Sequence, residues 1–95
     1  MKSAFELAME RLGGNVRQYT TEQKEQLADV DRLYDAKVVQ AKFDAEARRR
    51  QAGDDAKKLK QIDEDLASEV RSLETKRGRK KDELRKAFET ADPKP

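Results

Sequence analysis

The chain is predicted to be all-α: a long antiparallel helical hairpin of the coiled-coil type, with a short N-terminal helix packed at its open end. Composition is the first reason. The 95 residues are 44% charged, 35% hydrophobic and rich in strong helix formers, which is typical of exposed helices that pack along narrow seams. The second reason is that both prolines, Pro93 and Pro95, lie at the very end, so that glycines are the main candidate breaks in the helical segments.

We expect a single helical domain over residues 1–92, with helices over 4–12, 21–52 and 55–90 and a disordered tail over 93–95. The first helix begins with a capping-box pattern from Ser3 to Glu6, carries a short apolar stripe and ends at Gly13. A helix of ~10 residues is too short to be stable alone in water, so it is predicted to dock on the rest of the chain.

The second helix is capped by Thr20 or Thr21, and no residue from Glu22 to Ala52 breaks helical propensity. Its apolar positions recur in steps of three and four, the spacing of one face of a nearly straight helix. These positions are Leu27, Val30, Tyr34, Val38, Ala41 and Ala45.

A turn at Gly53 is predicted to separate the second helix from the third, for which Asp54 or Asp55 is a suitable N-cap. The third helix has its own apolar stripe, with a gap where the stripe positions are Arg77 and Lys80. The stripe consists of Ala56, Leu59, Ile62, Leu66, Val70, Leu73, Leu84, Ala87 and Phe88.

Folding the chain at Gly53 pairs residues whose numbers add to about 107, and this register sets small side chains against large ones. Ala45 then meets Ile62, and Val30 meets Arg77. If the chain instead continued through Gly53 as one helix, two chains would have to pair. The basic residues near Gly53 would then lie in the middle of a rod.

Positive charge gathers in two places. Residues 48–60 hold six cations against two aspartates, and both arms of the hairpin are basic there, so neither arm is expected to neutralise the other. The second basic run faces the acidic start of the second helix, where intramolecular pairing would set the register. The candidate nucleic-acid-binding residues are Arg48, Arg49, Arg50, Lys57, Lys58 and Lys60 at the tip, and Lys76, Arg77, Arg79, Lys80 and Lys81 in the second run.

Neither run contains an aromatic residue, and Tyr34 belongs to the apolar stripe, so base stacking and sequence-specific readout are not expected. The chain also lacks histidine and cysteine, the usual general base, thiol nucleophile and transition-metal ligands. We expect no enzyme activity, no cofactor, no metal site and no small-molecule substrate. No apolar run approaches the ~20 residues of a membrane span, and the lack of cysteine favours a cytoplasmic location.

The chain opens with Ser3-Ala4-Phe5-Glu6-Leu7-Ala8-Met9-Glu10-Arg11-Leu12 and continues with Thr21-Glu22-Gln23-Lys24, Leu27-Ala28-Asp29-Val30-Asp31 and a Gly53-Asp54 turn. In these stretches it resembles the small helical signature protein of the Planctomycetes–Verrucomicrobia–Chlamydiae bacteria. The opening motif is the distinctive one. The resemblance implies a housekeeping protein that binds DNA and RNA non-specifically, and it implies no particular binding residues.

The sequence thus predicts a helical hairpin that binds the phosphate backbone of DNA or RNA through lysine and arginine, with strong salt dependence. The alternative is a structural coiled-coil or protein-interaction module without nucleic-acid affinity, whose charges serve register, solubility and partner choice. In that case the basic tip is only a solvated end. A homo-oligomer is expected under the second interpretation and is compatible with the first.

Overall fold

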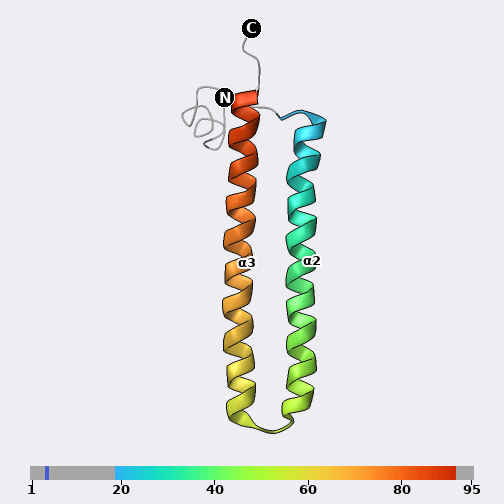
Figure 1. Ribbon diagram of the computed structural model, residues 1–95, viewed down its shortest axis with the longest axis vertical. Coiled ribbons are helices and arrows are strands. Elements are labelled where there is room, and N and C mark those ends of the chain that lie inside the picture. The colour runs from blue at the N-terminus through green and yellow to red at the C-terminus, as the bar shows by residue number, and fades with distance from the viewer. Residues whose placement is uncertain (1–3, 5–18, 92–95) are drawn as a thin grey trace.

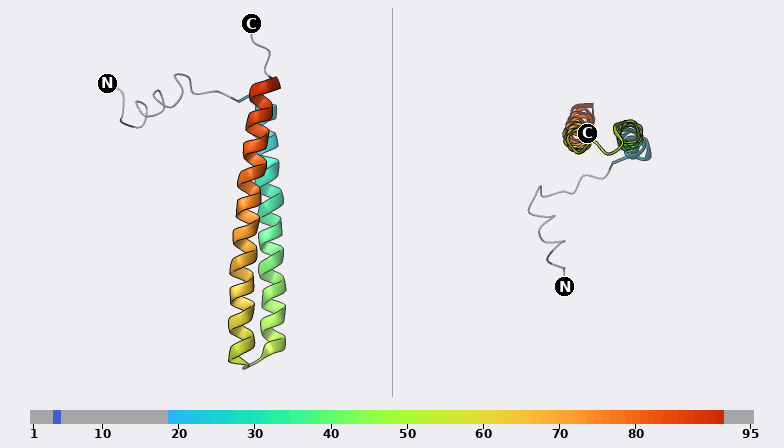
Figure 2. Two further views of the ribbon diagram at one scale, coloured as in Figure 1. Left: turned by 60° about the vertical axis from the view of Figure 1, so that its left-hand side comes forward. Right: turned by 90° about the horizontal axis from the view of Figure 1, so that it is seen from below.

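The computed structural model describes residue 4 and residues 19–91. Two long helices, α2 (Thr21–Ala52) and α3 (Ala56–Ala91), pack against each other as an antiparallel hairpin (Figure 1). They stay side by side along their length in the turned views as well (Figure 2). The predicted all-α hairpin is confirmed. The helix expected over 4–12, its docking at the open end and the tail over 93–95 lie outside the described residues, apart from position 4.

The start of α2 is set by a capping box, with Thr20 rather than Thr21 as the N-cap. The Thr20 hydroxyl accepts a hydrogen bond from the Gln23 backbone N–H at 3.1 Å, and the Gln23 side chain accepts one from the Thr20 N–H at 2.9 Å. Two backbone donors that the helix leaves without partners are satisfied in this way.

The hairpin turn is formed by Ala52-Gly53-Asp54-Asp55. Gly53 has φ 60° and ψ −120°, and the Asp55 N–H donates to the Ala52 carbonyl at 3.2 Å, the geometry of a type II′ turn. The Asp55 carboxylate then accepts from the Lys58 N–H at 3.2 Å and caps α3, which therefore begins one residue later than expected. The chain reverses at Gly53 and does not continue as one helix.

The seam between the helices is lined by buried and half-buried positions that recur in steps of three and four, on average about 3.6 residues apart. This spacing matches the period of a straight α-helix, so the same faces stay in contact along the rod. The positions are Gln23, Leu27, Val30, Tyr34, Val38, Ala41, Ala45, Arg49 and Ala52 in α2, and Leu59, Ile62, Leu66, Val70, Leu73, Arg77, Lys81, Leu84 and Phe88 in α3.

When the two helices are aligned antiparallel so that the numbers of facing residues add to 111, every position of the α2 set faces a position of the α3 set. The expected register of 107 is wrong by about one helical turn. Four residues are about one helical turn, so shifting one helix by four residues again places apolar positions opposite apolar positions. The apolar pattern therefore could not distinguish the two registers. Small side chains still face large ones: Ala45 lies level with Leu66, and Ala41 with Val70.

The gap in the α3 stripe is filled by Arg77 and Lys81, whereas Lys80, the expected stripe position, is exposed. Ala56 and Ala87 are exposed as well and lie off the seam. At the open end of the hairpin the Tyr19 ring meets the buried Phe88 edge-on, with centroids 5.7 Å apart. Such edge contacts are the favoured geometry of aromatic pairs.

Candidate nucleic-acid interface

Two residues of the second basic run are neutralised within the hairpin. Arg77 binds Asp35 at 2.5 Å and Asp31 at 3.4 Å, and Lys81 binds Asp31 at 3.0 Å. The hydrogen bond with Asp35 raises the pKa of Arg77, and the hydrogen bond from Lys81 lowers the pKa of Asp31. The side chains of Arg77 and Lys81 are only 21% and 23% exposed. The expected intramolecular pairing is therefore present, and these two cations are not available to a ligand.

Arg49 at the tip is also neutralised, contrary to the expectation that neither arm could neutralise the other. Its Nε donates to the Asp63 carboxylate at 2.9 Å, and its guanidinium lies 3.2 Å from Glu46. The hydrogen bond with Asp63 raises the pKa of Arg49. The pairing was not foreseen because Asp63 lies beyond the basic segment, and only the register brings it back to Arg49.

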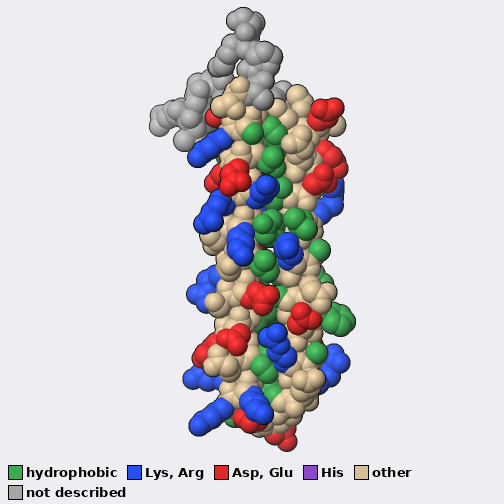
Figure 3. Space-filling view, viewed as in Figure 1, with side chains coloured by type: hydrophobic (Ala, Val, Ile, Leu, Met, Phe, Trp, Pro, Cys, Tyr) green, Lys and Arg blue, Asp and Glu red, His purple; other side chains and the backbone are tan. Residues whose placement is uncertain are grey.

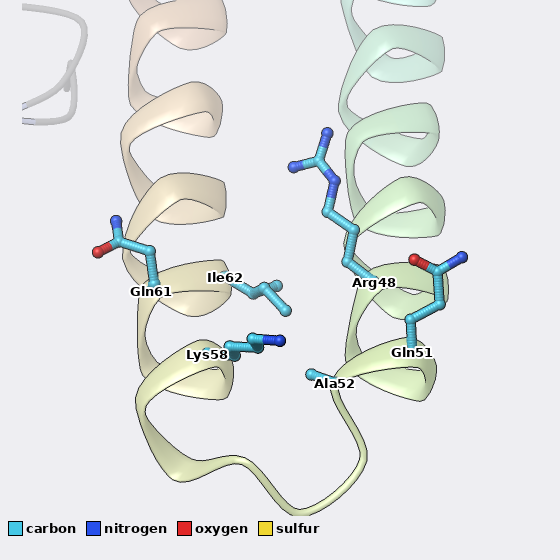
Figure 4. A pocket seen from close by; sticks show the side chains of 6 residues that line it. All are labelled: Arg48, Gln51, Ala52, Lys58, Gln61 and Ile62. Atoms are coloured by element: carbon cyan, nitrogen blue, oxygen red, sulfur yellow. The ribbon is translucent and has the colours of Figure 1, made fainter.

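Five cations around the turn remain exposed and form no ion pair with any described residue. We call them the tip cluster: Arg48, Arg50, Lys57, Lys58 and Lys60. Arg48 and Lys58 come from opposite helices and extend toward the space between them, beside the apolar side chains of Ala52 and Ile62 (Figure 4). The shallow groove that they flank has a volume of about 300 Å³.

Two aspartates moderate the charge of the tip cluster. Asp55 is engaged as the N-cap of α3, where it also complements the positive end of the helix dipole. Asp54 is exposed and makes no hydrogen bond or ion pair with a described residue. The tip therefore keeps an excess of positive charge after its internal contacts are counted.

The exposed members of the second run form a smaller group, the mid-stalk cluster, which consists of Lys76, Arg79 and Lys80. These side chains line a groove of about 150 Å³ together with Glu83 and the half-buried Tyr34 of α2. The second basic run itself contains no aromatic residue, but the hairpin brings Tyr34 of α2 beside these cations, because the register sets Tyr34 level with Arg77.

The two clusters share one edge of the hairpin but are not continuous. Lys58 and Lys76 are 18 residues apart, which is five turns and ~27 Å along α3, so they project from the same side. Asp65 and Glu69 lie between them on that side. Figure 3 shows this arrangement as basic side chains near the tip and along the upper part of the seam, with acidic ones between. A phosphate chain would meet two separate positive sites.

Within the described residues, no group of three or more histidine, cysteine, aspartate or glutamate side chains is arranged to hold a metal ion. Over the same part of the chain, neither helix combines the length and the apolar character that crossing a lipid bilayer requires.

Comparison with protein-family models, with curated proteins and with solved structures finds no significant match to this chain. The family resemblance drawn from the opening motif and the turn therefore stays a prediction.

Proposed function

We propose that the protein binds the phosphate backbone of DNA or RNA without sequence preference, and that the tip cluster makes the main contact. The observation that carries the proposal is that the basic side chains differ in how available they are to a ligand. Arg49, Arg77 and Lys81 are held by carboxylates, whereas the five tip cations have no described partner. They come from both helices around one turn, so a single strand or duplex edge can meet several of them at once.

The number of available charges limits the affinity. Five phosphate contacts give a salt slope of at most about −4.5 for duplex DNA and about −3.5 for a single strand. Non-specific binding of this kind has a Kd on the order of 10⁻⁴ M at physiological salt, and it tightens steeply as salt is lowered. No tip side chain is aromatic, so stacking adds nothing there.

The test is a fluorescence anisotropy titration of random-sequence duplex DNA and single-stranded RNA at several salt concentrations. The double variant Arg48→Gln and Lys58→Gln removes two exposed, unpaired charges at the tip. Its slope for duplex should become shallower by about 1.8. The matched control, Lys24→Gln with Lys86→Gln, removes the same charge at the opposite end of the rod, from exposed positions that also pair with no described residue.

If the tip variant and the control lose affinity equally, only the net charge matters, and the tip is refuted as the binding site. Failure of the wild-type protein to bind either nucleic acid at low salt would refute the function itself. If only the double variant Lys76→Gln with Lys80→Gln loses affinity, the mid-stalk cluster is the binding site instead of the tip. The cytoplasmic location expected from the lack of cysteine is part of the same proposal.

The second candidate function, an interaction module without nucleic-acid affinity, is favoured by a different observation. Leu33, Val39 and Phe43 of α2 are 54%, 61% and 70% exposed. Apolar side chains that gather on one exposed face are typical of protein contact surfaces.

A further inference from the structure

The outer face of α2 carries a second apolar stripe, opposite the seam. It is formed by Leu33, Ala36, Val39, Phe43 and Ala47, which follow each other in steps of three and four and are all exposed. At 100° per residue they fall within about a third of the circumference of the helix. The space-filling view shows apolar side chains standing out along the outer edge of α2 (Figure 3). We call this face the outer stripe.

The outer stripe belongs to α2 alone among the described helices. Three large apolar side chains among residues 19–91 are more than half exposed; all three lie on this stripe and none lies on α3. The hairpin needs only the inner seam to hold itself together, so the outer stripe serves no contact between α2 and α3. An amphipathic helix with two apolar faces has two surfaces to cover.

We propose that the outer stripe binds the same stripe of a second copy of this chain, antiparallel, about a two-fold axis near Val39 and Gln40. In this arrangement Phe43 of one copy lies against Ala36 of the second copy, and Leu33 lies against Ala47. Large side chains meet small ones on both sides of the axis. A surface that complements itself in this way is what a two-fold contact requires.

The charges beside the outer stripe fit the same axis. Lys37 lies level with Asp44 of the second copy on one flank, and Lys37 has no ion-pair partner among the described residues of its own chain. In an antiparallel pair the same flank of each helix meets its counterpart, so Lys37 and Asp44 approach each other twice on this flank.

The size of the contact sets the expected strength. The segment from Asp29 to Arg50 is ~33 Å long, and one helix face of that length gives an interface at the low end of specific complexes. We therefore expect a dimer that dissociates at micromolar concentration. This inference does not depend on nucleic-acid binding.

Sedimentation velocity of the full chain over 2–500 µM tests the dimer. The wild-type protein should change from monomer to dimer. Phe43→Glu should remain monomeric, whereas Thr75→Glu, the same charge change at an exposed position of α3, should behave like the wild type. Lys37→Asp should weaken the dimer, and adding Asp44→Lys should restore it. A monomer throughout, as expected if another segment of the chain covers the stripe, would overturn the proposal, and so would a failure of the charge swap to restore the dimer.

Cysteine cross-linking tests the axis, because the natural chain has no cysteine. Gln40→Cys places the thiol beside the axis and should form a disulfide-linked dimer under mild oxidation. Gln26→Cys is exposed on the same side of α2, but lies ~40 Å from its copy in the antiparallel dimer and should not cross-link. Equal cross-linking at both positions would indicate a parallel or non-specific contact and would overturn the antiparallel arrangement.

Discussion

Alanine at Gly53 and alanine at Gly78 should change stability in opposite directions. Both glycines have open space where a Cβ atom would stand, with no atom within 4 Å, so neither substitution causes a clash. They differ in backbone conformation. Gly78 lies inside α3, whereas Gly53 has φ 60° and ψ −120°, a combination that residues with a side chain avoid.

The magnitudes follow from this difference. At Gly53 the backbone strain costs roughly 1–3 kcal/mol, offset by about 0.4–1 kcal/mol because alanine also restricts the unfolded chain. The free energy of unfolding should therefore fall by about 1–2 kcal/mol. At Gly78 helix propensity alone should raise it by about 1 kcal/mol. D-Alanine at position 53, introduced by chemical synthesis, suits a positive φ and should cost nothing or stabilise.

Urea unfolding followed by circular dichroism at 222 nm, at one fixed protein concentration, measures these changes. For a domain of this size, 1 kcal/mol also corresponds to a shift of about 4–8 °C in Tm. Stabilisation by alanine at both positions would refute the turn. It would show that the chain continues through Gly53 as one helix, since alanine favours a continuous helix at either site.

Three further predictions concern the ion pairs and the aromatic contact. Asp63→Asn combined with Glu46→Gln should release Arg49 to the ligand and steepen the duplex salt slope by about 0.9; an unchanged slope would show that Arg49 does not reach the phosphates. Asp31→Asn should lower stability at neutral pH. Pairing lowers the pKa of Asp31 below its ordinary 3.8, so the contribution of Asp31 to the free energy of unfolding is present above that pH and is lost below it. The free energies of unfolding of the variant and the wild type, measured with urea, should therefore converge toward about pH 2. A double-mutant cycle on Tyr19 and Phe88 should give a coupling of about 0.5–1.5 kcal/mol; zero coupling would contradict the edge contact.

Features with a local cause could be predicted from the sequence. The capping pattern at Thr20 and the lack of helix breakers set the bounds of α2, because a helix end depends on which residues satisfy its free backbone groups. Gly53 followed by two aspartates set the turn and the next N-cap for the same reason. The spacing of the apolar residues showed which face of each helix would be covered.

Features that depend on the alignment of the two helices could not be predicted. The sequence admits two registers one turn apart, and the choice decides that Arg49 meets Asp63 and that Tyr34 joins the mid-stalk cluster. The outer stripe was visible in the spacing of Leu33, Val39 and Phe43, but apolar residues on two faces of one helix do not reveal which face is covered. Only packing against α3 left these three exposed.

The sequence by itself determined two long helical segments, a break at Gly53 and the cations on either side of it, since each of these depends on neighbours within a few residues. The tertiary structure decided that the chain reverses at Gly53 and which cations are available. An ion pair between α2 and α3 requires two side chains within about 4 Å, and that distance is set by the register of the whole seam. For this reason Arg48 and Lys58 at the tip pair with no described residue, whereas Arg49, between them along the chain, pairs with Asp63.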